Sequence, residues 1–194
     1  MYSHGAAPAS LYTAAGKRKY LVDAERARFI EAAKACPRTE IGTLCLTLVY
    51  TGCRITEALK LERSSVEAEA GFIAFRCLKK RNGKTVIREV PVPSDLLNAI
   101  RQMRATSEDD RLWHFSRSRA WQLVKDVMAK AHIPNGIHAT PKGLRHGFGI
   151  HAVQSGIPLN LVQRWLGHAR METTAIYLQA MGCEERQIAM RMWT

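Results

Sequence analysis

The sequence predicts a mainly α-helical domain with one small antiparallel β-hairpin. Two observations lead to this fold class. Most of the chain carries apolar residues at helical spacing, whereas residues 72–93 carry β-branched and aromatic residues on both sides of Asn82 and Gly83. An Asn-Gly pair between such runs is the strongest short signal for a β-hairpin. The length of 194 residues and the apolar fraction of 46% fit one domain with a hydrophobic core.

The elements before the hairpin follow from helix signals. Residues 1–16 are small, rich in alanine and without apolar periodicity, so we expect a flexible tail there and the folded domain over 17–194. Asp23 can cap a first helix, which a proline ends. Residues 40–51 are apolar nearly all round, which predicts a buried helix, and Gly52 is suited to end it.

The elements after the hairpin are again helices. Ser94 can cap one of them, and a polar loop over 106–110 separates it from a helix over 118–133. The remaining apolar periodicity predicts further helices near 141–154, 158–166, 172–180 and 184–192. The last of these is short and amphipathic, so two placements stay open: on its own domain or on another protomer.

The charge of the chain indicates an anionic partner. The 29 lysines and arginines exceed the 17 aspartates and glutamates, which gives a formal charge of +12. Nucleic acid and an anionic membrane surface are the two candidates for such a charge. The longest apolar stretch, at 41–53, is interrupted by Gly42 and three threonines and is too short to span a bilayer. The sequence therefore favours nucleic acid and no membrane.

The cysteines and the N-terminus favour the cytoplasm. The five cysteines contain no CxxC pair, which is typical of small buried side chains in a reducing compartment. The first ten residues lack both the basic start and the apolar run of a signal peptide.

No acidic cluster has metal-ligand spacing, so a two-metal nuclease is disfavoured and neither a metal nor another cofactor is expected.

A basic cluster lies at the start of one predicted helix, in the stretch TPKGLRHGFG. Thr140 can cap this helix and Pro141 suits its first position, so Lys142 and Arg145 share one face of the first turns. Free backbone N–H groups, the positive end of the helix dipole and two cations together predict an anion site. His146 lies off this face, and we therefore expect it to be less important than Lys142 and Arg145.

Two further segments carry polar residues that can join such a site. Arg54 follows a glycine break between two helices, and Glu57, three residues later, can hold its guanidinium. His168 follows a helix-ending glycine, and Tyr177 lies on the next helix. Taken singly, Arg54 and Glu57 also fit a surface ion pair, and Tyr177 also fits a half-buried core position.

The order and spacing of these motifs resemble the tyrosine recombinase (phage integrase) family. TGCRITEAL, KGLRH and LGHARMETTAIY follow one another, with 23 residues from Arg145 to His168 and nine from His168 to Tyr177. The resemblance covers roughly residues 20–192 and implies the catalytic fold of the DNA breaking-rejoining enzymes. It places Arg54, Arg145, His168 and Tyr177 on the catalytic positions of the family.

The resemblance also implies a catalytic lysine on the β-hairpin, just before its turn. Lys79 follows the strand directly and is our choice, whereas Lys80 stays open as the alternative. Basic residues of the hairpin tip are then expected to contact DNA: Lys80, Arg81 and Lys84. One position departs from the family, because Lys142 stands where a histidine is usual. We interpret Lys142 as a third phosphate-binding cation, with Tyr177 deprotonated mainly by the positive field.

The implied function is site-specific DNA recombination of the integrase or invertase type, on mobile elements. In this chemistry a tyrosine oxygen attacks a phosphodiester to give a 3′-phosphotyrosine, and a 5′-hydroxyl later reverses the step without a cofactor. The implied partner is double-stranded DNA with inverted-repeat sites, on which protomers form dimers and tetramers through the C-terminal helix. A catalytically idle DNA-binding regulator and a type IB topoisomerase are the alternatives. Only a short segment precedes the motifs, so we expect a catalytic fragment or a short family member.

Overall fold

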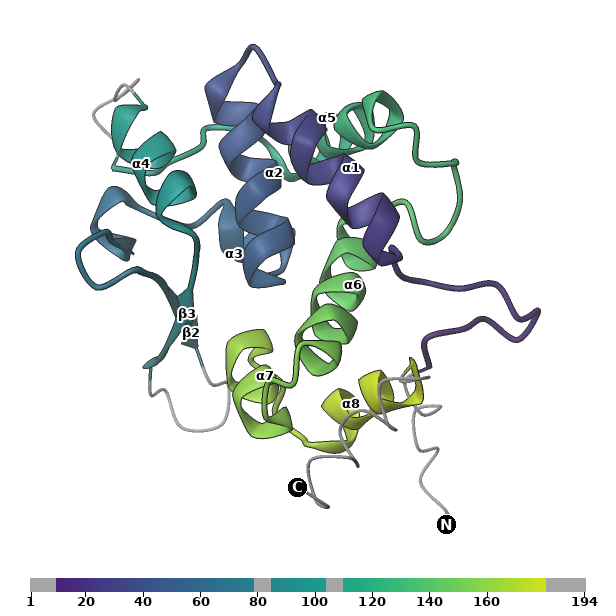
Figure 1. Ribbon diagram of the computed structural model, residues 1–194. Helices are drawn as coiled ribbons and strands as arrows, with labels where there is room; N and C mark the ends of the chain where they lie inside the picture. Colours follow the sequence, from purple (N-terminus) through teal and green to yellow (C-terminus); the bar gives the residue numbers. More distant parts are fainter. Residues whose placement is uncertain (1–9, 79–84, 104–109, 181–194) are drawn as a thin grey trace, which may run out of the picture.

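The computed structural model describes residues 10–78, 85–103 and 110–180 (Figure 1). Helices dominate this part and a small antiparallel sheet lies at one side of it, which confirms the predicted fold class. The helical elements are α1 (Asp23–Lys34), α2 (Thr39–Thr51), α3 (Ile55–Ala58), η1 (Arg63–Ser65), α4 (Ser94–Gln102), α5 (Arg117–Lys130), α6 (Pro141–Gln154), α7 (Leu159–Leu166), α8 (Glu172–Ala175) and η2 (Ile176–Ala180).

The sheet contains the predicted hairpin and one strand more. Strands β2 (Phe72–Leu78) and β3 (Thr85–Pro91) pair antiparallel, and a two-residue strand β1 (Val66–Glu67) adds to the free edge of β2. A strand of two residues is too short to show alternation, so the sequence did not reveal β1. The predicted turn at Asn82 and Gly83 lies outside the described residues, as do most of the polar loop and the helix at 184–192.

Helix α2 forms the centre of the molecule, as its uniformly apolar sequence predicts. It packs against α1, α4, α5 and α6. Two of its buried threonines, Thr43 and Thr51, donate their hydroxyls to carbonyls of the same helix. Thr51 Oγ1, for example, donates to the Thr47 carbonyl at 2.6 Å. The helix ends at Gly52, whose φ of 60° is left-handed and whose Cα lies against Phe148, so that a Cβ there would approach the ring to 2.5 Å.

Two hydrophobic clusters hold the described part together. The larger one lies between α1, α2, α4, α5 and the sheet, with Phe29, Leu44 and Trp113 among its fully buried members. The smaller one lies around α6, α7 and η2 and includes Val162 and Tyr177. Helix α6 contributes to both clusters, so its axis connects the two halves of the fold.

The N-terminal segment differs from the predicted flexible tail over 1–16. Residues 1–9 lie outside the described part, but Leu11 is 0% exposed and belongs to the smaller cluster. The Lys19 amide donates to the Leu11 carbonyl at 2.8 Å, and Tyr12 pairs with Arg18 in an antiparallel bridge. One leucine among alanines gives no periodicity, which is why the sequence pattern concealed this turn.

Helix boundaries shift slightly from those expected. Asp23 and Ser94 are the first helical residues rather than the caps, and Val22 and Pro93 occupy the cap positions. The Val22 amide instead donates to Glu25, at 3.1 Å. The single helix expected over 172–180 is divided into α8 and the 3-10 turn η2.

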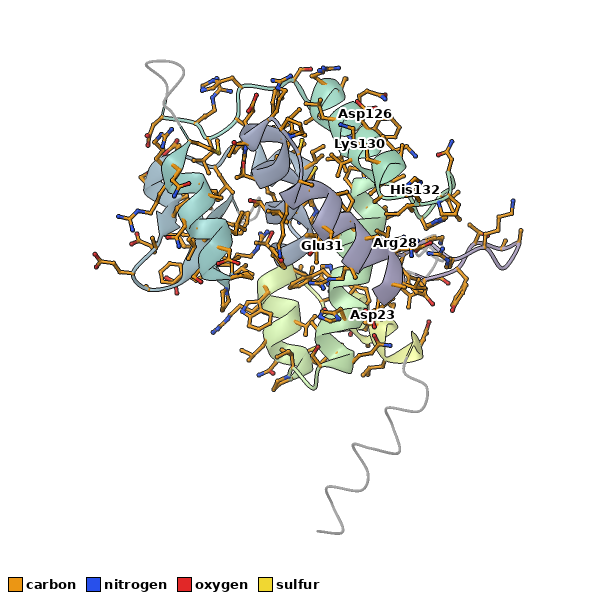
Figure 2. All side chains as sticks on the ribbon, turned by 45° about the horizontal axis from the view of Figure 1, so that its top comes forward. Asp23, Arg28, Glu31, Asp126, Lys130 and His132 are labelled. Carbon is orange, nitrogen blue, oxygen red and sulfur yellow. The ribbon has the colours of Figure 1, made fainter. Side chains whose placement is uncertain are left out.

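The face formed by α1 and α5 carries both signs of charge. Figure 2 shows acidic and basic side chains intermingled there, from α1, α5 and the residues that follow α5: Asp23, Arg28, Glu31, Asp126, Lys130 and His132. Mixed charge of this kind gives no strong field for a polyanion. Within residues 10–78, 85–103 and 110–180, no helix combines the length and hydrophobicity needed to cross a bilayer.

Candidate active site

Arg54 stands in the break between α2 and α3, as the sequence predicts. It is the cap residue of α3 and half exposed, and its Nη1 donates to Glu57 Oε1 at 3.0 Å. The Arg54 amide donates to the other oxygen, Glu57 Oε2, at 2.7 Å. Both the backbone and the side chain of Arg54 are therefore held by one carboxylate, while the guanidinium remains open to solvent on one side.

A second arginine, which the sequence analysis missed, completes this ion pair from the sheet. Arg88 of β3 is 4% exposed, and its Nη2 donates to Glu57 Oε2 at 2.8 Å. Its Nε donates to the Trp165 carbonyl at 2.9 Å, and its guanidinium lies 4.7 Å from the Phe75 ring centroid. Arg88 lies on the same face of β3 as buried Val90. A charged residue on the apolar face of a strand is the signal by which the sequence could have indicated Arg88.

Glu57 is ionised at neutral pH despite its burial. Burial by itself raises the pKa of this carboxyl, but hydrogen bonds and charges from Arg88 and Arg54 outweigh it and hold the pKa at about 2. The carboxylate thus links α3 to β3 through Arg88, which in turn donates to the Trp165 carbonyl of α7. Three elements that are distant in sequence are fixed relative to one another by one ionic network.

Arg145 lies inside the molecule, at the meeting point of three helices. Thr140 caps α6 by accepting from the Gly143 amide at 3.1 Å, and Pro141 begins the helix, as expected. Arg145 is 8% exposed, and its Nη1 and Nη2 donate to the carbonyls of Gly52 and Leu166, both at 2.7 Å. These carbonyls end α2 and α7, and the negative ends of two helix dipoles stabilise the cation.

Arg145 remains charged although its side chain is buried. Burial and the neighbouring Arg54 guanidinium lower the pKa of Arg145 to about 10, which still leaves the side chain protonated at neutral pH. A guanidinium has five N–H groups, and the two carbonyl bonds leave others for a ligand. Arg54 and Arg145 together therefore form a site of concentrated positive charge.

His168 follows α7 in the position that the sequence predicts. Gly167 ends α7 with a φ of 66°, and a Cβ there would lie 2.9 Å from Arg88 Nη1. His168 Nδ1 forms a hydrogen bond of 2.9 Å with Thr174 Oγ1. Burial, then the charges of Arg145 and Arg54, lower the pKa of His168 to about 4, so the imidazole is neutral at neutral pH.

Tyr177 is buried in η2 and stacks on His168. The side chain is 1% exposed, and the two rings lie 6.3 Å apart at an interplanar angle of 20°. Burial raises the pKa of Tyr177 to about 12, although Arg145 and Arg54 act in the opposite direction. The ring also rests on Gly149 of α6, where a Cβ would approach it to 2.5 Å. The phenol is thus protonated in this state.

His146 lies closer to the candidate site than its position off the Lys142–Arg145 face predicts. The Tyr177 hydroxyl lies 3.4 Å from His146 Nδ1, and the two rings meet edge to face with centroids 6.0 Å apart. A residue of α6 need not share the face of Lys142 and Arg145 to reach the site, because η2 also packs against this helix. Lys142 itself is exposed in the first turn of the helix.

The predicted site residues therefore fall into two groups. Arg54, Arg145, His168 and Tyr177 come together from α3, α6, the end of α7 and η2. The hairpin residues Lys79, Lys80, Arg81 and Lys84 lie outside the described residues. Within the part that is described, no group of three metal-ligating side chains occurs.

An open groove of about 1280 Å³ adjoins the site, between α3, α7 and the sheet. Arg54 and His168 form one end of it, and Phe75, Val86 and Ile87 give it an apolar floor. Further cations lie along its walls: Lys60, Arg76, Arg111 and Arg164. A groove of this size and charge suits an extended polyanion better than a small molecule.

Comparison with known proteins identifies the family of the chain. The model of the phage integrase family matches residues 19–182. The tyrosine recombinase XerA of Pyrococcus furiosus is 33% identical over 172 residues, which are 82% of this chain and 56% of that protein. The tyrosine recombinase XerD of Mycobacterium tuberculosis is 32% identical over 157 residues, 73% of this chain and 48% of the relative.

Solved structures show the same fold. The crystal structure of XerA recombinase superimposes with a TM-score of 0.72 at 27% identity, over 89% of this chain and 64% of the other. The catalytic domain of bacteriophage HP1 integrase gives 0.65 at 20% identity, over 88% of this chain and 92% of that domain. The chain spans about half the length of the curated relatives it matches. With a family match over most of its length, the chain belongs to the phage integrase family.

Proposed function

We propose that this chain is the catalytic domain of a site-specific DNA recombinase that cleaves and rejoins strands through a 3′-phosphotyrosine. The observation that carries the proposal is the meeting of Arg54, Arg145, His168 and Tyr177 at one charged site. These residues come from four separate elements, and mere DNA binding has no need of a buried tyrosine among them. Membership of the phage integrase family supports the same conclusion.

The chemistry follows from the residue types. The Tyr177 oxygen attacks the scissile phosphorus, the new O–P bond forms, and the bond from phosphorus to the 5′-oxygen breaks. Negative charge develops on the non-bridging oxygens, where the forked guanidiniums of Arg54 and Arg145 stabilise it. A neutral His168 can donate one N–H to the same phosphate. Attack by a 5′-hydroxyl then reverses the step, so no cofactor is consumed.

The leaving 5′-oxygen needs a proton, and a hairpin lysine is suited to give it. We assign this role to Lys79, with Lys80 as the alternative, and expect Arg81 and Lys84 to contact the DNA backbone. Lys142, exposed at the start of α6, serves as a further cation toward the phosphate.

The proposed catalytic domain over 17–194 extends to Leu11 at its N-terminal end, because the Leu11 side chain is buried with the rest of the domain.

The proposed partner is double-stranded DNA with inverted-repeat sites. The cations of the groove beside Arg54 and the formal charge of +12 support a duplex as ligand. Dimers and tetramers on such sites are proposed to form through the segment 184–192, in the cytoplasm. Binding by phosphate contacts predicts an affinity that falls steeply with salt.

A nicked suicide duplex tests the proposal. Cleavage near the nick releases a short strand that diffuses away, so the covalent protein–DNA adduct accumulates. The wild-type chain is expected to form an adduct that resists denaturation, and Tyr177→Phe is expected to form none. Arg145→Lys keeps a charge but loses the forked donors, and we expect a rate lower by about 10²–10³.

One outcome of the same experiment identifies the alternative function. A protein that shifts the duplex in a gel yet forms no adduct is a catalytically idle DNA-binding regulator. Tyr177→Phe would then leave the shift unchanged, and no covalent product would form with any variant. In contrast, an adduct that disappears with Tyr177→Phe and slows with Arg145→Lys identifies an enzyme.

A further inference from the structure

The hydroxyl of Tyr177 has a partner that the family resemblance did not indicate. A phenol as deeply buried as Tyr177, at 1% exposure, needs a hydrogen-bond partner for its O–H group. In the described structure that partner is His146 Nδ1, at 3.4 Å. The two side chains come from α6 and η2, which pack together along the smaller hydrophobic cluster. The contact is therefore built into the fold.

The protonation state of His146 follows from its surroundings. Burial lowers the pKa of His146 to about 4, and the cations Lys142 and Arg145 of α6 and Lys19 of the N-terminal segment act in the same direction. The imidazole is thus neutral at neutral pH and has one N–H group and one nitrogen with a free lone pair. The phenol of Tyr177 is protonated, so its O–H can donate to Nδ1 when the imidazole carries its own proton on Nε2.

The other candidates near the hydroxyl are less suited to accept its proton. Lys142 carries a charged ammonium group with no lone pair, and it is exposed at the first turn of α6. His168 presents the face of its ring to Tyr177, whereas its lone pair lies in the ring plane, and its Nδ1 already bonds Thr174. His146 presents the edge of its ring, with Nδ1 toward the oxygen.

We propose that His146 is the general base that accepts the proton of Tyr177, and this rests on the proposed recombinase function. As the phenolic oxygen bonds to phosphorus, its O–H bond breaks and the proton moves to Nδ1, while the 5′-oxygen leaves with a proton from a separate acid. In the reverse step the imidazolium returns this proton to the departing Tyr177 oxygen. His146 thus takes over a task for which Lys142, in the usual histidine position, has no lone pair.

Because the pKa values of Tyr177 and His146 are far apart, no proton transfer between them occurs without DNA. With the Tyr177 pKa at about 12 and the His146 pKa at about 4, the proton remains on the phenol in the free protein. A bound phosphodiester brings a negative charge that raises the proton affinity of the imidazole. Formation of the O–P bond makes the phenol far more acidic, so the proton moves during the reaction rather than before it.

The first experiment needs no DNA. In protein labelled with ¹⁵N-histidine, long-range ¹H–¹⁵N spectra report which ring nitrogen carries the proton. We expect His146, assigned by loss of its signals in His146→Asn, to be neutral at pH 6 with the proton on Nε2. Tyr177→Phe should shift the Nδ1 resonance and leave that of His151 unchanged. An imidazolium at pH 6, or a proton on Nδ1, overturns the proposal.

The second experiment measures single-turnover cleavage of the nicked duplex. His146→Asn retains an acceptor but cannot take up a proton, and we expect cleavage to slow by about 10²–10⁴. Imidazole in the buffer should restore part of the rate to His146→Ala. His151→Asn is the matched control, because His151 lies on the same helix but pairs with Asp23 at 3.2 Å. Its rate is expected to equal that of the wild type.

A change of nucleophile separates proton transfer from mere positioning. Replacement of Tyr177 by 3,5-difluorotyrosine gives a more acidic phenol, which needs a base less, so the deficit of His146→Asn should become smaller. An unchanged deficit, or His146→Asn cleavage within threefold of wild type, rejects the base while the proposed function stands. A wild-type protein that forms no adduct rejects the proposed function and this assignment together.

Discussion

At the scale of single residues, the ion pair of Arg88 and Glu57 connects the stability of the fold to the candidate site. Two side chains that are 4% and 17% exposed share charge and hydrogen bonds in the interior. Removing one partner of such a pair leaves the other charge buried and uncompensated. The exposed Arg54 depends on the same carboxylate, so loss of Arg88 also affects the candidate site.

We expect Arg88→Met to lower the free energy of unfolding by about 3–5 kcal/mol, because it leaves the Glu57 carboxylate buried without its main partner. Urea unfolding followed by circular dichroism measures the change. Arg38→Met is the matched control: Arg38 pairs with Glu40 at 2.7 Å on the surface, and such a pair contributes about 0–1 kcal/mol. Equal effects of the two variants would contradict the network described here.

Glu57 also predicts how stability depends on pH. Its pKa is depressed to about 2 in the folded protein from an ordinary value of 4.5, so the folded state favours the carboxylate. The stabilisation is complete above pH 4.5 and is lost as pH falls toward 2. In urea titrations at several pH values, Glu57→Gln should flatten the loss of stability below pH 4.5, whereas Glu31→Gln, at an exposed position, should not.

At the scale of elements, helix α6 positions several residues of the candidate site. Arg145 and His146 are adjacent in this helix, and Gly149 provides the flat surface on which the Tyr177 ring rests. The three contacts occur within five residues, so the rotation of this one helix sets the relative positions of the cation, the proposed base and the phenol.

Gly149→Ala tests the contact between α6 and η2. A Cβ at this position would lie 2.5 Å from the Tyr177 ring, so we expect overpacking that lowers the free energy of unfolding by about 1–3 kcal/mol. In a Tyr177→Ala background the ring is absent, and the same substitution should instead stabilise the helix by up to about 1 kcal/mol. Urea unfolding of the four proteins measures this change of sign, and a constant effect would contradict the packing.

The sequence predicted most elements but only part of the site. Uniform hydrophobicity identified α2, and Thr140 and Pro141 identified the start of α6. The motif spacing and the family resemblance predicted that Arg54, Arg145, His168 and Tyr177 share one site. Arg88 and His146 were missed, because their roles depend on which faces of β3 and α6 meet other elements. Local periodicity describes one element at a time, whereas such contacts are properties of the packed structure.

At the scale of the whole molecule, the segment before α1 closes the smaller hydrophobic cluster. Leu11 contributes a fully buried side chain to the same cluster as Tyr177, although it lies far from Tyr177 in the sequence. The beginning of the described chain and the candidate nucleophile therefore belong to one hydrophobic cluster.

Leu11→Ala is expected to lower the free energy of unfolding by about 2–5 kcal/mol, as for other buried leucines. Leu178→Ala is its control, because Leu178 is 42% exposed on η2 and its truncation should leave the free energy of unfolding nearly unchanged. Chemical denaturation measures both. A small effect of Leu11→Ala, equal to that of the control, would show that the segment is a detachable tail after all.

The two carbonyls that accept hydrogen bonds from Arg145 also bear on the rates of folding and unfolding. They lie 93 and 21 residues from it along the chain, so the pocket for an anion closes only after distant segments have found one another. An anion bound to Arg145 then stabilises the finished structure and not the states that precede it. Phosphate or sulfate should accordingly slow unfolding while leaving the folding rate nearly constant, so that the free protein persists longest where anions are abundant.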